Sequence, residues 1–341
     1  MAVIGVVGAG AWGTAFAVQL AKNGHAVRLW AFEPDLVQTM RQTRENDLYL
    51  PGIEIPETVT PTAEMAKACD VQIVVLACPS NHFRAVASKA VEHTPHDAPL
   101  VILTKGLEEQ TLELMTEVLV GMLDPQRAAR IAVLSGPSFA REVAEGQPTD
   151  VVLAALDNAV AKQLQQQFHT PFFRVYTSDD PIGVQVGATI KNVIAIAAGG
   201  IDGMGLGLNT RAALITRGLA EVTRLGVAKG ANPLTFLGLA GIGDLVLTCT
   251  GELSRNRTFG KRVARGEGPL EIIESQGAVV EGYYAAKAGY RLSQQLGVDM
   301  PITEQVYKVL HEDKPLQDAL RDLLKREFKD ELMGIVRVDS S

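Results

Sequence analysis

Residues 3–17 read VIGVVGAGAWGTAFA, and the interpretation of the whole chain starts from this stretch. The apolar run from Val3 to Val7 predicts a short buried strand. Gly8, Gly10 and Gly13 follow at the spacing GxGxxG, directly before a helical run. In this pattern Gly8 permits a tight turn, Gly10 lets the backbone approach a pyrophosphate, and Gly13 lets the helix pack closely on the strand. The N–H groups at the helix start would then face an anion.

The residues after this turn supply the context that a GxGxxG pattern needs, because the chain contains 32 glycines and many glycine spacings arise by chance. A helix is predicted from Thr14 to Asn23 with Gly24 at its C-terminal cap, and a second strand is predicted from Ala26 to Trp30. These elements complete a βαβ unit of the dinucleotide-binding type. The alternative is a glycine turn in an ordinary α/β protein.

The residues that follow the second predicted strand bear on the choice of dinucleotide. Glu33 can bond the ribose hydroxyls of NAD, whereas an arginine in this region would favour the additional phosphate of NADP. Glu33 lies slightly late for this role and Phe32 is uncharged. The sequence therefore leaves NAD and NADP as alternatives.

Length and composition exclude several other classes of protein. The chain has 341 residues, 47% of them hydrophobic, which is enough for two domains with substantial cores. Its formal net charge is -7 and it has no basic run, so we expect no nucleic-acid partner. Three scattered cysteines and six histidines show no metal-ligand spacing and fit a reducing cytoplasm. The N-terminal segment is interrupted by glycines, so neither a signal peptide nor a membrane span is expected.

Short apolar strands continue to alternate with helices as far as residue 176, which predicts an α/β domain with a mostly parallel, doubly wound sheet of the Rossmann type. Ligands bind such sheets outside the carboxyl ends of the strands. The residues after each strand are therefore candidates for ligand binding, and Ser80 or Asn81 is expected to cap a helix. Strands are expected at 71–77, 100–104, 131–134, 151–155 and 172–176, helices at 36–45, from 83 and at 159–168, and a loop at 50–61.

The pattern changes after Asp179-Asp180-Pro181, where helical periodicity replaces the strands. We predict a dinucleotide-binding domain over residues 1–180 and an all-α domain over residues 181–341. The helices should break near Pro233, Pro269 and Pro301. A terminal strand fragment at residues 334–338 is the one possible exception.

The first long helix of this second domain carries a single cation. Residues 183–200 are apolar on nearly every side, which is typical of a buried helix. Lys191 shares a helical face with small residues, so its ammonium would lie at the floor of a close-packed cleft. Burial lowers the pKa of a lysine and suits it for proton transfer. In the alternative, Lys191 extends to the helix edge or pairs with a buried acid.

Ser254-Arg255-Asn256-Arg257 lies where a loop after Gly251 would enter another helix. Capping residues, the N–H donors of a helix start and the planar arginine fork together suit a phosphate group. Taken alone, such a segment is more often a solvated basic helix start. Asp244 is an expected partner for Lys191 or for a substrate hydroxyl, or else a helix N-cap.

The chain resembles the bacterial type of NAD(P)-dependent sn-glycerol-3-phosphate dehydrogenases, essentially from end to end. The resemblance rests on ungapped blocks that occur in the same order as in that family. These blocks are GAGAWGTA from Gly8, TKGLE from Thr104, SGPSFAREV from Ser135, GATIKNVIAIAAG from Gly187, TRGLAE from Thr216, GLAGIGDLVLTCT from Gly238, SRNR from Ser254 and VVEGY from Val279.

The resemblance implies interconversion of dihydroxyacetone phosphate and sn-glycerol 3-phosphate with NADH or NADPH, a reaction that feeds glycerophospholipid synthesis. It implies Lys191 as the general acid and base. It further implies Lys105, Asn192 and Asp244 around the carbonyl and hydroxyls, Ser254, Arg255 and Asn256 around the phosphate, and additional contacts from Gly136 and Ser138. The cofactor-binding residues implied are Gly8, Gly10, Ala11, Trp12, Gly13, Phe32, Lys105, Ala140, Arg255, Val279 and Glu281.

Phe32 departs from the basic residue that many family members carry after the second strand, which weakens any inference of NADP preference. Relatives suggest a homodimer in the cytoplasm. Two alternatives to this function remain. One is a dehydrogenase of similar build that acts on another ketone or on a 2-hydroxy acid. The other is a redox sensor that binds the dinucleotide without turnover, which would have no need for Lys191 or for a second anion site.

Overall fold

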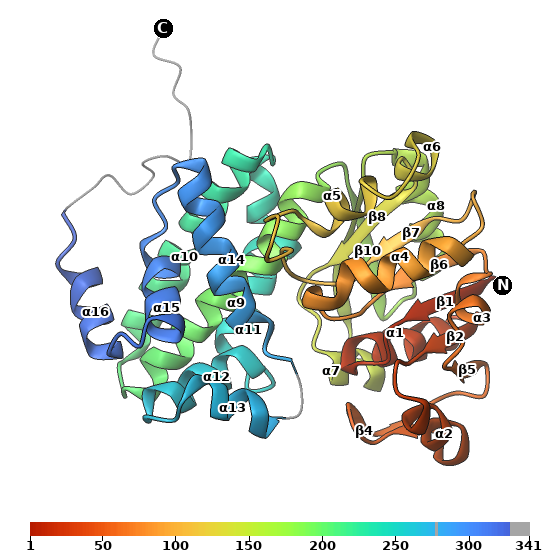
Figure 1. The fold of residues 1–341 in the computed structure, drawn as a ribbon, viewed down its shortest axis with the longest axis horizontal. Coiled ribbons are helices and arrows are strands. Elements are labelled where there is room, and N and C mark those ends of the chain that lie inside the picture. The colour runs from red at the N-terminus through yellow and green to blue at the C-terminus, as the bar shows by residue number, and fades with distance from the viewer. Residues whose placement is uncertain (277–278, 328–341) are drawn as a thin grey trace, which may run out of the picture. The chain divides into compact units, whose positions relative to one another are not determined.

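The strands of the N-terminal part assemble as the alternating pattern predicts. The computed structural model describes residues 1–276 and 279–327, apart from the side chain of Gln276 (Figure 1). The predicted strand fragment at residues 334–338 lies outside the described residues. The strands are β1 (Val3–Val7), β2 (Ala26–Trp30), β3 (Glu45–Asn46), β4 (Leu50–Glu54), β5 (Val59–Thr62), β6 (Ile73–Leu76), β7 (Leu100–Ile102), β8 (Ile131–Ser135), β9 (Thr149–Ala155) and β10 (Phe173–Ser178).

Eight of these strands form one sheet in the order β10-β9-β8-β7-β6-β1-β2-β5. Six neighbouring strands of this sheet, β8-β7-β6-β1-β2-β5, have the strand order of dinucleotide-binding sheets. Each neighbouring pair among these six is parallel. β9 is antiparallel to β8, with Leu134 opposite Leu153, and β10 runs parallel to β9. The structure therefore confirms the predicted mostly parallel sheet. The turns after β1, β6, β7 and β8 lie at one edge of it.

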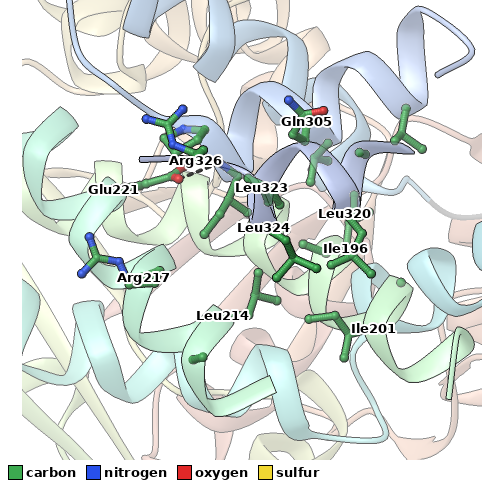
Figure 2. A pocket seen from close by; sticks show the side chains of 18 of the residues that line it. Ile196, Ile201, Leu214, Arg217, Glu221, Gln305, Leu320, Leu323, Leu324 and Arg326 are labelled. Carbon is green, nitrogen blue, oxygen red and sulfur yellow. Dashed lines mark hydrogen bonds between the residues drawn. The ribbon is translucent and has the colours of Figure 1, made fainter. Parts of the chain in front are cut away.

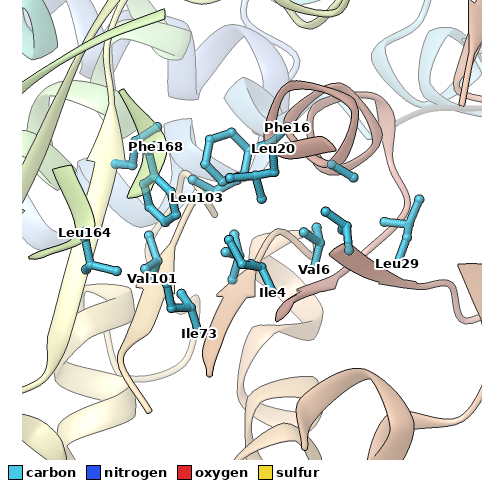
Figure 3. Close-up of a cluster of buried hydrophobic side chains, with 14 of the residues drawn as sticks. Ile4, Val6, Phe16, Leu20, Leu29, Ile73, Val101, Leu103, Leu164 and Phe168 are labelled. Atoms are coloured by element: carbon cyan, nitrogen blue, oxygen red, sulfur yellow. The ribbon is translucent and has the colours of Figure 1, made fainter. Parts of the chain in front are cut away.

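Helices cover this sheet and bury its apolar side chains. They are α1 (Ala11–Lys22), α2 (Pro34–Thr43), α3 (Met65–Cys69), η1 (Ser80–His82), α4 (Phe83–His93), α5 (Met115–Val120), α6 (Pro125–Ala128), α7 (Ala140–Glu145) and α8 (Asn158–Phe168). Figure 3 shows the core where Phe16 of α1 meets Phe168 of α8, with ring centroids 5.3 Å apart in an edge-on arrangement. Fully burying an aromatic or large aliphatic side chain contributes about 1.5–3 kcal/mol. This cluster therefore holds α1 and α8 on the sheet.

Two predictions about the N-terminal part are wrong. The segment predicted as a loop at 50–61 contains β4 and β5, and β5 pairs with β2 at the edge of the sheet. Pro61 belongs to β5, and an edge strand tolerates a proline because one side of the strand needs no partner. Neither Ser80 nor Asn81 caps α4, because both residues belong to the short helix η1 and the N-cap is His82.

The C-terminal part contains helices and their connections, with no strand among its described residues. Its helices are α9 (Pro181–Gly203), α10 (Leu208–Lys229), η2 (Pro233–Leu237), η3 (Leu239–Gly243), α11 (Asp244–Thr250), α12 (Arg255–Ala264), α13 (Pro269–Gln276), α14 (Glu281–Leu296), α15 (Pro301–His311) and α16 (Leu316–Leu324). The predicted breaks are present, and Pro233, Pro269 and Pro301 each begin the helix that follows the break. Proline is favoured there because the first helical residues need no N–H donor inside the helix.

The chain divides into two compact units. Unit 1 comprises Met1–Lys105 and Glu113–Pro181, and unit 2 comprises Gly106–Leu112 together with the chain from Ile182 onward. The short segment Gly106–Leu112 thus leaves the sheet after β7 and groups with the helical unit. The predicted domain boundary at residue 180 placed this segment in the first domain.

Candidate active site

Lys191 lies near the middle of α9 and is buried, with only 5% of its surface exposed. Its ammonium forms a short ion pair with the carboxylate of Asp244, which is 1% exposed. It also donates to the Thr248 hydroxyl at 3.1 Å. The predicted pairing of Lys191 with Asp244 is therefore confirmed. The alternative in which Lys191 extends to the helix edge is wrong, whereas the pairing with a buried acid is present.

Asp244 owes its position to the start of α11. The π-helical turn η3 leads directly into Asp244, which is the first residue of α11, whereas the N-cap is Gly243. The interpretation of Asp244 as an N-cap is therefore wrong. The Thr248 hydroxyl donates to the main-chain carbonyl of Asp244 at 2.6 Å, so its oxygen remains the acceptor for Lys191.

Thr248 is a residue that our sequence interpretation missed. It lies four positions after Asp244 on the same helix, so the spacing alone places both side chains on one face. Cys249 follows it and is fully buried, and burial raises the pKa of its thiol to about 12. A thiol with such a pKa stays protonated near neutral pH and is a poor nucleophile.

Hydrogen bonds of two asparagine side chains connect three helices, starting at Asn192, the residue after Lys191. The Asn256 side chain donates to Asn192 Oδ1 at 2.9 Å, and Asn256 Oδ1 accepts from the main-chain N–H of Gly282 at 3.0 Å. These bonds connect α9, α12 and the start of α14. Asn192 and Asn256, both predicted as substrate-binding residues, are therefore in contact, and Asn192 is the residue after Lys191 on α9.

Ser254 and Arg255 stand at the start of α12. Ser254 is the N-cap and its hydroxyl accepts from the Arg257 N–H at 3.2 Å, as its residue type predicts. Arg255 is exposed. Desolvation lowers the pKa of its guanidinium, and the carboxylate of Glu281 acts against that shift. Arginine nevertheless remains charged in proteins, so Arg255 presents a cation next to a helix start.

Arg257 differs from the solvated basic residue that the SRNR segment alone suggests. It is 6% exposed. Its Nε donates to Asp202 at 2.7 Å, and a second nitrogen donates to Glu252 at 2.8 Å. Asp202 also pairs with Arg211 at 3.0 Å. These ion pairs fasten the loop before α12 to the end of α9 and the start of α10.

The glycine turn in unit 1 has the geometry that its spacing predicts. Gly8 has φ +121°, and a Cβ atom there would lie 2.7 Å from the Ala77 carbonyl carbon. A Cβ atom on Gly13 would lie 1.9 Å from the Gly8 oxygen, so α1 approaches the turn as closely as a glycine allows. At Gly10, the N-cap of α1, nothing lies within 4 Å of such an atom. The turn therefore leaves open space beside the first N–H groups of α1.

Two further features of this turn fit a bound dinucleotide. Ala11 begins α1, and among the described residues the buried indole N–H of Trp12 has no hydrogen-bond partner. It is therefore a donor available to a ligand. Asn46, which sequence interpretation also missed, is fully buried and donates to the Ala9 carbonyl and to the Thr14 hydroxyl, both at 2.8 Å. No pattern of periodicity singles out Asn46, because its contacts come from a remote segment.

The remaining predicted residues of unit 1 follow the carboxyl ends of strands. Phe32 comes after β2 and is 77% exposed. Lys105 follows β7 and is half-buried. After β8, Gly136 has φ +143° and its carbonyl accepts from the Ser138 hydroxyl at 2.9 Å. Ala140 begins α7 and is half-buried. In unit 2, Val279 is likewise half-buried and lies two residues before Glu281, the first residue of α14.

A cavity of about 1140 Å³ lies elsewhere in unit 2, and none of the predicted site residues lines it. Figure 2 shows Leu320, Leu323 and Leu324 of α16 in its wall, together with Ile196 and Ile201 of α9. In the described part of the chain, no group of three or more His, Cys, Asp or Glu side chains could hold a metal ion. Within residues 1–276 and 279–327, one helix, α9, is long and apolar enough to cross a membrane, but 89% of its most apolar window is buried inside the structure, as in a core helix.

Known proteins resemble this chain along nearly its whole length. It matches the family NAD-dependent glycerol-3-phosphate dehydrogenase, with the N-terminal model over residues 3–161 and the C-terminal model over residues 180–321. A glycerol-3-phosphate dehydrogenase (NAD(P)+) of Geobacter metallireducens is 52% identical over 329 residues, which cover 96% of this chain and 98% of that protein. A crystal structure of glycerol-3-phosphate dehydrogenase from Coxiella burnetii has a TM-score of 0.90 and 40% identity, and covers 95% of this chain and 99% of the other.

Both family models and these relatives agree with the Rossmann-type sheet and the helical unit described above, and they confirm the resemblance that the sequence blocks indicate. The chain therefore belongs to the NAD-dependent glycerol-3-phosphate dehydrogenase family and is an NAD(P)-dependent oxidoreductase.

Proposed function

We propose that this chain interconverts dihydroxyacetone phosphate and sn-glycerol 3-phosphate, and that Lys191 transfers the proton. The observation that supports this role is the buried cluster in which Lys191 contacts Asp244 and Thr248. A buried ion pair is by itself weak support for a stabilising role, because desolvation offsets much of the attraction. Its occurrence in a dehydrogenase family, beside Asn192 and Asn256, favours a catalytic role.

In the direction of ketone reduction, the cofactor, when bound, would supply the hydride for the carbonyl carbon. The Lys191 ammonium donates a proton to the oxygen as negative charge develops there. Asp244 and Thr248 hold the ammonium in place. In the oxidative direction, neutral Lys191 accepts the proton from the hydroxyl.

We assign phosphate binding to Ser254, Arg255 and Asn256 at the start of α12. The Ser254 oxygen accepts one hydrogen bond, which leaves its O–H as a donor. The helix start adds N–H donors, and the Arg255 guanidinium adds charge. Binding energy from the phosphate can then align the reacting carbon with the hydride donor. Lys105, Asn192, Gly136 and Ser138 are the further substrate contacts in this proposal.

The dinucleotide is assigned to the turn of unit 1. The space at Gly10, the close approach at Gly13 and the indole N–H of Trp12 support this assignment. The further cofactor-binding residues in this proposal are Phe32, Lys105, Ala140, Arg255, Val279 and Glu281. Unit 1 is thus the dinucleotide-binding domain in this proposal, and unit 2 is the substrate-binding and catalytic domain.

The resemblance also supports a homodimer that works in the cytoplasm, and the three buried cysteines are compatible with a reducing compartment. Light scattering of the purified chain would test the dimer. A monomer at micromolar concentration would contradict it.

The test of the function is the initial rate of NADH and NADPH oxidation with dihydroxyacetone phosphate. We expect turnover by the wild-type chain, and the ratio of the two kcat/KM values gives the cofactor preference. Lys191→Ala should lose kcat by roughly three orders of magnitude, because general acid catalysis contributes about 10²–10⁴-fold. The same variant should still bind cofactor, as measured by fluorescence titration.

Two outcomes would contradict the proposal. Wild-type-like turnover by Lys191→Ala would remove the lysine from catalysis. Absence of turnover by the wild-type chain, with cofactor binding intact, would instead revive the dinucleotide sensor.

A further inference from the structure

Lys105 is the last residue of unit 1 before the chain leaves it. The preceding residue, Thr104, is tied to the sheet, because its hydroxyl donates to the Cys78 carbonyl at 2.7 Å. Residues 106–112, which we call the crossing loop, belong to unit 2, and the chain returns to unit 1 at Glu113. Lys105 therefore follows a residue that is bonded to the sheet and directly precedes the crossing loop.

The crossing loop has a defined internal structure. Leu107 and Leu112 are buried, with 6% and 7% of their surfaces exposed. Thr111 donates to the Glu108 carboxylate at 2.7 Å, and the Leu112 N–H donates to the Glu108 carbonyl at 2.9 Å. Leu112 has φ +63°, a left-handed conformation that is strained for a bulky side chain. Such a conformation persists only where the surroundings impose it, and it is found most often at functional sites.

Two cations of α14 hold this loop. Lys287 Nζ lies 2.6 Å from Glu109 Oε1, and Arg291 donates to the Glu109 carbonyl at 2.8 Å. The two cations are four residues apart, so they share one face of the helix. The Lys287 and Glu109 side chains are 42% and 35% exposed, and exposed pairs typically contribute less than about 1 kcal/mol to folding. The pair is thus better suited to fixing a position than to stabilising the fold.

The same helix is connected to the surroundings of Lys191. Its second residue, Gly282, donates to Asn256, which in turn donates to Asn192. A continuous path of hydrogen bonds and one rigid helix therefore leads from the residue next to Lys191 to Glu109. Glu109 belongs to the crossing loop, and this loop begins directly after Lys105.

We infer that Glu109, Lys287 and Arg291 are positioning residues that hold Lys105 for the phosphorylated triose. The inference rests on the proposed function, in which Lys105 contacts the substrate. A lysine side chain has four rotatable bonds, so a displaced main chain would spread its ammonium over many positions. Misplacing a substrate-binding group by about 1 Å can cost up to a hundredfold in rate.

The experiment is a double-mutant cycle with steady-state kinetics on dihydroxyacetone phosphate. Lys287→Met keeps the apolar stem and removes the charge, and Glu109→Gln removes the opposite charge. Each should lower kcat/KM roughly tenfold, mainly through KM. In a Lys105→Ala background, neither should cause a further loss, because the group that they position is absent. Lys287→Arg, which keeps the cation, should retain most activity.

Lys308→Met is the matched control, because Lys308 forms a 2.6 Å pair with Glu304 on α15 of the same unit and belongs to no predicted site. Its kinetics should equal those of the wild type. Losses that add to those of Lys105→Ala would overturn the inference and leave Lys105 as a substrate ligand. If Lys105→Ala alone left the kinetics unchanged, the proposed role of Lys105 would fail as well.

Discussion

Thr248 joins Lys191 to the start of α11 through a single hydroxyl group. Its oxygen accepts from the lysine while its proton goes to the Asp244 carbonyl. Thr248→Val keeps the shape and removes both bonds. We expect kcat to fall roughly tenfold, because a hydrogen bond to a charged group is worth about 1.5–3 kcal/mol, part of which water can replace.

The control for this change is Thr250→Val on the same helix. The Thr250 hydroxyl donates to the carbonyl of Val246 one turn earlier, at 2.7 Å, and the residue is exposed. Its kinetics should be unaffected. Equal kcat values for Thr248→Val and the wild type would show that Asp244 suffices to hold Lys191.

Arg255 is the residue whose loss should affect substrate binding most selectively. Removing a charged donor to a phosphate costs about 1.5–3 kcal/mol, so Arg255→Ala should raise KM for dihydroxyacetone phosphate by roughly 10- to 100-fold. Arg265, the exposed C-cap of α12, carries the same charge at the other end of the helix. Arg265→Ala should leave KM unchanged. A similar small effect of both variants would exclude Arg255 from the phosphate site.

At the scale of the element, two glycines at the start of α1 have different roles, one in packing and one in ligand binding. A methyl group on Gly13 would collide with the Gly8 carbonyl, whereas one on Gly10 would meet no atom within 4 Å. Gly13→Ala should therefore lower the thermal midpoint, since overpacking costs about 1–3 kcal/mol. Gly10→Ala should keep that midpoint and weaken cofactor binding at least tenfold, because its methyl group would lie where the pyrophosphate approaches.

Calorimetric unfolding and cofactor titration of the two variants check this prediction together. An unchanged Kd for NADH and NADPH in Gly10→Ala would show that the cofactor does not approach the turn. A large loss of stability in Gly10→Ala would instead show that the space beside Gly10 is needed for the fold.

Some strands and helices could be predicted from the sequence alone, and others could not. β1 and β2 have the predicted bounds, and α8 begins one residue earlier than expected, because apolar periodicity and glycine breaks are local properties. β5 does not follow from local pattern. Val59–Thr62 contains a proline and becomes a strand only through pairing with β2.

At the scale of the whole molecule, Glu221 makes stability depend on pH. This carboxylate lies on α10 and accepts from the N–H groups of Ile302 and Thr303 at the start of α15. Burial raises its pKa to about 7, from an ordinary value of 4.5. Between these two values the folded chain binds more protons than the unfolded chain. The free energy of unfolding should therefore fall as the pH rises through this interval.

The size of this effect follows from the shift. One pKa unit corresponds to about 1.4 kcal/mol, so Glu221 should account for a decrease of roughly 3 kcal/mol between pH 4.5 and pH 7. Urea unfolding of the wild type and Glu221→Gln at several pH values measures it, because the difference between the two curves removes the contribution of other groups. Parallel curves for the two proteins would contradict the predicted shift.

In the candidate site too, residues with a local sequence pattern could be predicted, whereas contacts between remote segments could not. The sequence offered Asp244 as a partner for Lys191 or for a substrate hydroxyl, and the structure shows that it pairs with Lys191. Thr248 could have been found from its four-residue spacing. Asn46, and the bond between Asn192 and Asn256, could not be found in this way, because each depends on how remote segments pack.

The sequence by itself determined the alternating order of strands and helices, the glycine turn, the helical second unit and the family. These features depend on backbone periods and on ungapped blocks of residues, which are properties of neighbouring positions. Only the tertiary structure decided which distant residues meet. Lys191 and Asp244 are 53 positions apart, and Glu109 and Lys287 are 178 positions apart. Such contacts depend on the packing of whole helices, which no local pattern specifies.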